Sequence, residues 1–132
     1  GSPESAIKLN GTAGATGNII GGEDADQGNI ITKTIENAIT ILGTTASTSI
    51  LSNYIGVSYD ADADVYTPSA PDDIKNHGIF ISGVGVTGSK INKNVIGNVA
   101  AGFSGVYVEN AKGVTSLFIT SPTPIDALST LK

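Results

Sequence analysis

The sequence predicts an all-β fold, and specifically a parallel β-solenoid of about four coils. A pattern of aliphatic, any, aliphatic, any, turn residue occurs four times, beginning at Ile7, Ile39, Ile79 and Val106. A second pattern, asparagine, two large apolar residues and glycine, follows the first three copies, at Asn18, Asn53 and Asn94. The apolar residues alternate over four or five positions, as in half-buried strands, and show no helical period. Self-similarity of this kind is typical of repeats that bury their apolar sides by stacking.

The four copies of the first pattern are separated by steps of 32, 40 and 27 residues. Short strands with turns between them at this spacing fit the coils of a solenoid. Residues 53–78 form one long acidic loop insertion in the second coil. The expected strands are residues 6–10, 17–20 and 29–35; 38–42 and 49–55; 78–82, 90–96 and 98–103; and 105–109 and 116–120.

Stacked coils place equivalent side chains above one another, so the pattern predicts four inward-facing ranks. The ranks are Ile7, Ile39, Ile79 and Val106; Leu9, Ile41, Ile81 and Val108; Ile20, Ile55 and Ile96; and Ala15, Ile50 and Ile91. Each buried aliphatic side chain contributes about 1.5–3 kcal/mol, so these ranks would carry most of the stability. Because asparagine bonds readily to the backbone near turns, Asn18, Asn53 and Asn94 are expected to form an internal ladder at a corner.

The composition excludes several classes of function. The net charge is −5, with seven lysines and no arginine, which argues against a nucleic-acid partner because arginine is the preferred ligand of phosphates and base edges. Cysteine is absent, which removes disulfides, thiolate zinc sites and cysteine nucleophiles. No apolar run approaches the roughly 20 residues of a membrane span.

The chain divides into three parts. Residues 1–5, beginning with Gly-Ser, are interpreted as a tag remnant or linker, and residues 6–120 as the solenoid domain. Residues 121–132 contain two prolines followed by spaced apolar residues, which suits a C-terminal cap or linker. We expect a fragment of a longer protein that is extracellular, on a cell surface or on a virion.

The repeated motifs resemble those of the pectin-lyase-like superfamily. The resemblance rests on Gly-Ile-x-Ile-x-Gly at 78–83, Asn-x-Ile-Gly at 53–56 and 94–97, and Ile-Ile-Gly-Gly at 19–22, and it covers about residues 6–120. It implies a right-handed, single-stranded parallel β-helix. Because that superfamily includes lyases, glycosidases, epimerases, phage tailspikes and non-catalytic surface proteins, the resemblance does not select one activity.

No catalytic residues are assigned. Enzymes of that superfamily use carboxylates with arginine or lysine on the outer face of one sheet. Among the outward positions expected on the first strand of each coil, only Glu109 is acidic and only Lys8 is basic. They lie several coils apart, so no acid–base pair can be assembled from these positions.

Calcium is the one cofactor that the sequence suggests. Asp60, Asp62 and Asp64 offer hard oxygen ligands at alternating positions, the kind that calcium prefers. The glycine and the later bidentate acid of a calcium loop are missing, because Val65 and Pro71 stand there. An exposed acidic loop is the alternative interpretation.

Four aromatic residues are candidates for ligand binding. Tyr59 and Tyr66 flank the aspartates, where rings beside polar groups suit sugars, although the rings could instead hold the long loop against the coil. Phe80 and Tyr107 are outward neighbours on adjacent coils. They predict a glycan platform, a subunit interface or a surface covered by the C-terminal tail.

Two other residues are interpreted as structural. Tyr54 is expected to hold the loop against the coil. His77 stands alone, without a second histidine or a cysteine to form a metal site, and is expected to be a corner residue.

We therefore expect a non-catalytic structural and adhesive module that contacts glycans or a partner, as in secreted, cell-surface or tailspike-type proteins. Because the first coil has no comparable cap, we expect further coils to precede it, or a homo-oligomer such as a trimer to cover its open end. The alternative is a scaffold fragment of a polysaccharide lyase or glycoside hydrolase.

Overall fold

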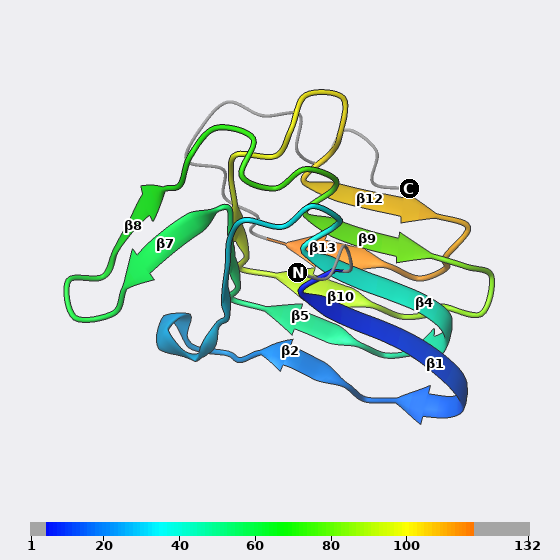
Figure 1. Ribbon diagram of the computed structural model, residues 1–132. Helices are drawn as coiled ribbons and strands as arrows, with labels where there is room; N and C mark the ends of the chain where they lie inside the picture. Colours follow the sequence, from blue (N-terminus) through cyan, green and yellow to red (C-terminus); the bar gives the residue numbers. More distant parts are fainter. Residues whose placement is uncertain (1–4, 118–132) are drawn as a thin grey trace.

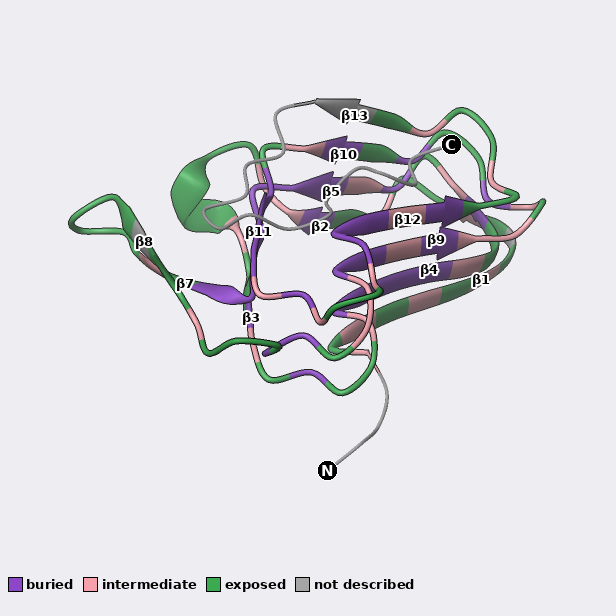
Figure 2. Ribbon diagram, turned by 90° about the horizontal axis from the view of Figure 1, so that it is seen from above, coloured by how far each residue is buried: buried purple, intermediate pink, exposed green. Residues whose placement is uncertain are grey.

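The computed structural model describes residues 5–117. In it the chain passes repeatedly between three parallel β-sheets (Figures 1 and 2). Each of the first three passes contributes one strand to sheet A, then one to sheet B, then one to sheet C. Sheet A is β1 (Ile7–Thr16), β4 (Ile39–Ala46), β9 (Ile79–Ser82) and β12 (Val106–Glu109). Sheet B is β2 (Ile19–Gly21), β5 (Ser49–Leu51), β10 (Lys90–Asn92) and β13 (Thr115–Leu117). Sheet C is β3 (Ile30–Ile31), β6 (Tyr54–Ile55) and β11 (Val95–Ile96).

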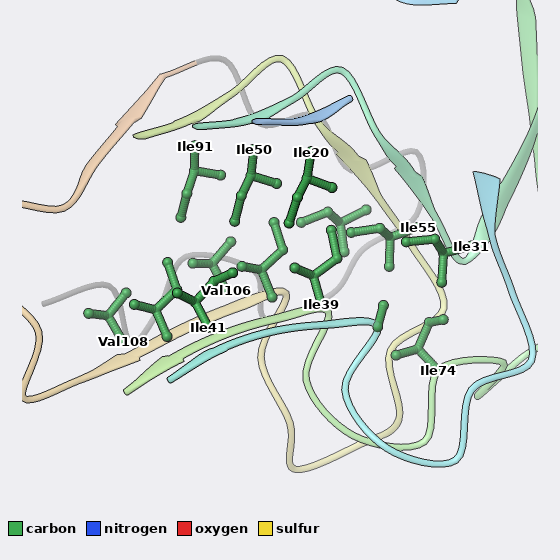
Figure 3. Packing of buried hydrophobic residues seen from close by; sticks show 14 of the residues in the cluster. Ile20, Ile31, Ile39, Ile41, Ile50, Ile55, Ile74, Ile91, Val106 and Val108 are labelled. Carbon is green, nitrogen blue, oxygen red and sulfur yellow. The ribbon is translucent and has the colours of Figure 1, made fainter. Parts of the chain in front are cut away.

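The register of sheet A confirms the first two predicted ranks. Ile7 pairs with Ile39, Ile39 with Ile79, and Ile79 with Val106. The rank that begins at Leu9 follows two residues later in the same strands, because alternate side chains of a strand share a face. Figure 3 shows these side chains meeting those of sheets B and C in one apolar interior.

The other two predicted ranks each began with the wrong residue, Ile20 in one and Ala15 in the other. Ile20 pairs with Ile50, which pairs with Ile91, so Ile20 belongs to sheet B. Ile31 takes the place predicted for Ile20, in register with Ile55, and Ile55 with Ile96. Ala15 lies in sheet A, opposite Thr45. The reason is the length of β1, which runs to Thr16 with a register shift between Gly11 and Ala15, so the first turn comes later than expected.

Two segments predicted as single strands are each divided by a corner. Residues 49–55 form β5 and β6, and residues 90–96 form β10 and β11, in different sheets. Ser52 and Lys93, at φ 58° and 60°, occupy the left-handed region at these corners. The strand predicted at 98–103 is absent except for a bridge between Val99 and Ile74. The cap predicted at 121–132 lies outside the described residues.

An asparagine ladder stands at one corner, with one member different from the prediction. Asn53 and Asn94 are fully buried, and Asn94 Oδ1 accepts hydrogen bonds from Asn53 N (2.9 Å) and Asn53 Nδ2 (3.0 Å). Asn53 Oδ1 accepts in turn from Asn29 N (3.0 Å) and Asn29 Nδ2 (2.9 Å). Asn29, not Asn18, is therefore the first member. Asn18 lies before β2, where its carbonyl accepts from Ser49 N.

The long insertion folds into an antiparallel hairpin that projects from the body (Figures 1 and 2). Its strands are β7 (Val57–Asp60) and β8 (Val65–Pro68). The short 3₁₀ helix η1 (Ala25–Gln27) lies between β2 and β3. Figure 2 shows burial concentrated in the stacked strands, while the hairpin tip is exposed.

Replacing Asn94 with alanine tests the ladder. The change leaves Asn53 N without its side-chain acceptor, removes one of the two acceptors of Asn53 Nδ2, and takes the side-chain donor away from the Ile50 carbonyl. Because one unsatisfied buried polar group costs about 1–3 kcal/mol, the free energy of unfolding should fall by at least about 2 kcal/mol in urea titrations. Asn18→Ala is the matched control, with an expected loss below about 0.5 kcal/mol. Equal losses for the two variants would contradict the ladder.

Candidate functional site

The outward side chains of sheet A stack across the strands just as the inward ones do. Lys8 pairs with Thr40, Thr40 with Phe80, and Phe80 with Tyr107. We call this row of four the outer rank. Phe80 and Tyr107 are half-buried, and their rings stack with centroids 5.8 Å apart and planes 18° from parallel. The sequence prediction that these two aromatic residues are neighbours is confirmed.

Two further rings join them. The His77 imidazole stacks on Tyr107 at 4.6 Å and lies nearly parallel to Phe80 at 5.7 Å. Phe103 meets the imidazole edge-on at 5.2 Å. Offset-stacked and edge-to-face pairs at these separations are favourable, so the rings hold one another in place. We call His77, Phe80, Phe103 and Tyr107 the aromatic cluster.

His77 is positioned by a second ladder, at the corner before the sheet A strands. Asn37 Oδ1 accepts a hydrogen bond from His77 N (3.0 Å), and His77 Nδ1 accepts one from Ser104 N (3.0 Å). The imidazole nitrogen thus acts here as an asparagine oxygen does, which confirms the prediction of a corner residue. Since Nδ1 accepts, the neutral ring carries its proton on Nε2.

Burial lowers the pKa of His77 below its ordinary value of 6.5. The groups facing the ring are the three neighbouring aromatic rings and the Ser104 N–H. The lowered pKa favours the neutral imidazole of His77 at pH 7.

A hollow of about 260 Å³ adjoins the aromatic cluster on the same outer face. Thr40 is only 4% exposed, and its hydroxyl bonds with Ser5 Oγ (2.5 Å) and Asn37 Nδ2 (3.1 Å). The hollow therefore brings an aromatic ring, amide and hydroxyl groups and two opposite charges together. Its lining residues are Ser5, Lys8, Glu36, Asn37, Thr40, Leu42 and Phe80.

The hairpin tyrosines lie apart from this face, on an element that projects away from sheet A (Figure 1). Tyr59 stacks on the buried Tyr54 at 4.2 Å, and Tyr54 donates its hydroxyl proton to the Ala25 carbonyl (3.1 Å). Tyr54 therefore fastens the hairpin to the body, as predicted. The backbone of Tyr66 pairs with that of Tyr59, while the Tyr66 side chain lies outside the description. The four predicted ligand residues thus belong to two separate places.

The three aspartates of the hairpin lie at the end of β7 (Asp60) and in the turn that follows it (Asp62 and Asp64). Asp60 Oδ1 accepts from Asp62 N (3.0 Å) and Ala63 N (3.3 Å), and Asp64 accepts from the Tyr59 hydroxyl (2.6 Å). The Asp64 bond raises the pKa of Tyr59 above its usual range. Within residues 5–117, no three His, Cys, Asp or Glu side chains form a group that could hold a metal. The geometry therefore adds no support to the calcium prediction.

Comparison with models of known families, with curated proteins and with solved structures found no match. The resemblance to the pectin-lyase-like superfamily therefore rests on the sequence motifs alone. In the described part of the chain, no helix has the length and apolar character to cross a membrane.

Sequence reasoning missed the contributions of His77 and Phe103 to the cluster, and of Glu36 and Asn37 to the hollow. A signal was available, because Asn37-Ala38-Ile39, His77-Gly78-Ile79 and Ser104-Gly105-Val106 occupy equivalent positions. The residues before each strand of sheet A must stack as the strands do. Whether the side chains of these residues point outward depends on how the backbone turns at the corner, and the pattern of the strands does not describe that turn.

The single histidine allows a direct pH measurement. Because the pKa of His77 is lower in the folded than in the unfolded chain, its neutral form contributes stability at pH values above about 6.5. This contribution declines as the pH falls below 6.5. An NMR titration should give a pKa below 6.5, and the free energy of unfolding should drop more between pH 7.5 and 5 than in His77→Asn. Equal drops, or a pKa above 6.5, would contradict the burial of the neutral ring.

Calcium should leave the hairpin unaffected. Asp60 and Asp64 already accept internal hydrogen bonds, and the residues that the structure describes form no metal cage. The melting temperature should therefore be the same with millimolar calcium as with EDTA. An increase that is lost in the Asp62→Asn variant would restore the site at Asp60, Asp62 and Asp64.

Proposed function

We propose that this chain is a right-handed parallel β-helix of about four coils that serves as a non-catalytic, adhesive module of an extracellular, cell-surface or virion protein. In this proposal the outer face of sheet A binds glycans. The rigid stack presents the aromatic cluster and the adjoining hollow side by side.

The path of the chain supports the β-helix. Its first three passes visit sheets A, B and C in the same order, and the neighbouring strands are parallel. Crossover connections between parallel strands of one sheet are right-handed in about 98% of cases, which favours that hand here.

The observation that carries the glycan proposal is the aromatic cluster beside a polar hollow. Sugars present apolar C–H faces that stack on rings and hydroxyls that need fixed hydrogen-bond partners. Phe80 and Tyr107 offer the rings. Asn37 and Thr40, fixed by their own hydrogen bonds, line the hollow together with Phe80. Because stacked strands hold these groups, little side-chain entropy would be lost on binding.

Alanine variants of the two half-buried rings, Phe80 and Tyr107, test the proposal. Binding to a panel of neutral and acidic oligosaccharides is measured by isothermal titration calorimetry. Phe80→Ala and Tyr107→Ala should each weaken binding about tenfold, or about 1.4 kcal/mol, without altering the fold by circular dichroism. Tyr59→Ala on the hairpin is the control and should bind as the unmodified chain does. Loss only in Tyr59→Ala would move the site to the hairpin.

One observation favours the alternative, a scaffold fragment of a polysaccharide-degrading enzyme. Glu36 and Lys8 line the same hollow, which assembles an acid and a base that the strand positions alone did not. Release of reducing ends from polysaccharide, abolished by Glu36→Gln, would favour the enzyme over the adhesive module.

A further inference from the structure

We infer that the hollow around Thr40 is a subsite for one neutral pyranose ring at the end of a glycan chain, and that it discriminates against uronic and sulfated sugars. The inference rests on the proposed function and names the class of sugar that the same face binds. It depends on the shape, the polar groups and the charge of the hollow.

The shape follows from the order of side chains in the outer rank. Thr40 is the smallest of the four and lies between Lys8 and Phe80, so the row has a notch at β4. Leu42, the next outward residue of β4, bounds the notch along the strand, and Glu36 and Asn37 bound it at the corner. The volume of about 260 Å³ lies below the range of about 300–1,000 Å³ typical of sites for drug-sized ligands, and suits a single ring.

The polar groups suit hydroxyls, which both donate and accept. Asn37 Oδ1 accepts from His77 N, and Asn37 Nδ2 donates one proton to Thr40, so a second proton of that amide remains. Glu36 Oε2 accepts from Asn76 Nδ2 at 3.5 Å, a long contact that leaves most of the carboxylate's acceptor capacity for sugar hydroxyls. The Phe80 ring forms the apolar side against which the face of the sugar can stack.

The charge argues for a neutral sugar. Lys8 and Glu36 are the two charged residues that line the hollow, and their charges cancel. The whole chain carries −5, which repels anionic ligands. A uronate or sulfate in the hollow would meet the Glu36 carboxylate without a surplus of positive charge to offset it.

The outer rank also gives the direction of the glycan. Neighbouring strands lie about 4.8 Å apart, so Thr40, Phe80 and Tyr107 span about 10 Å across sheet A. A chain lying across the strands would place its last ring over Thr40 and the following rings on Phe80 and Tyr107. In this arrangement the hollow binds the terminal sugar ring, and the aromatic cluster contacts the rings that precede it in the glycan chain.

The test uses neutral trisaccharides of β-1,4-linked glucose, mannose or galactose and the same compounds oxidised to uronates at C6. Calorimetry on the chain should show the neutral form binding at least about tenfold more tightly than its uronate. Glu36→Gln should weaken binding of the neutral trisaccharide about fivefold or more. It should also reduce the difference in affinity between the neutral trisaccharide and its uronate. Glu109, on β12 of sheet A, is also exposed but does not line the hollow, so Glu109→Gln is the matched control and should change neither value.

Two results separate this inference from the proposed function. Binding that depends on Phe80 but is unchanged by Glu36→Gln, or is tighter for the uronates, overturns the subsite and leaves the glycan-binding face. Absence of binding to every trisaccharide, together with no effect of Phe80→Ala across the larger panel, overturns both.

Discussion

The in-register stacking of branched aliphatic side chains between parallel strands is the interaction on which the structure depends. Ile39, Ile79 and Val106 are fully buried, and each lies directly beside its equivalent in the next pass. A slip of one residue would turn every inward side chain outward, so the apolar interior sets the register of all three sheets. Once that register is set, the backbone hydrogen bonds between passes follow from it.

At the corners, polar side chains rather than aliphatic ones stack from one pass to the next. A chain that bends between sheets interrupts its strand bonds, and the freed backbone groups need partners. At one corner the buried amides of Asn53 and Asn94 supply them, and at another Asn37 and His77 do. Glycine serves where no side chain fits. At Gly56, with φ 69°, a Cβ would lie 1.8 Å from the Gly97 carbonyl oxygen of the next pass.

The stacking of side chains on the outer face of sheet A follows from the stacking in the interior. Because inward residues are stacked, the outward residues between them are stacked too, which brings Phe80 onto Tyr107 without any local signal for the contact. His77 then serves two purposes, since Nδ1 completes the corner ladder while the ring face extends the aromatic cluster. The hollow arises in the same way, from a small Thr40 in a row of larger side chains. The candidate site is therefore a consequence of the repeat and of the few positions where the repeat varies.

The sequence by itself determined the parallel all-β stack, the two ranks of sheet A and the pairing of Phe80 with Tyr107, because these follow from a period of two residues and a recurring phrase. Only the tertiary structure decided where the chain turns between sheets. The extended β1 displaced Ala15 and Ile20 from their predicted ranks, and Asn29 replaced Asn18 in the ladder. The tertiary structure also decided that Glu36, Asn37 and Lys8 line the same hollow. The physical reason is that the alternation of apolar and polar residues along a strand indicates which face each residue occupies. The position of a corner depends instead on which buried polar groups can form hydrogen bonds with the neighbouring passes.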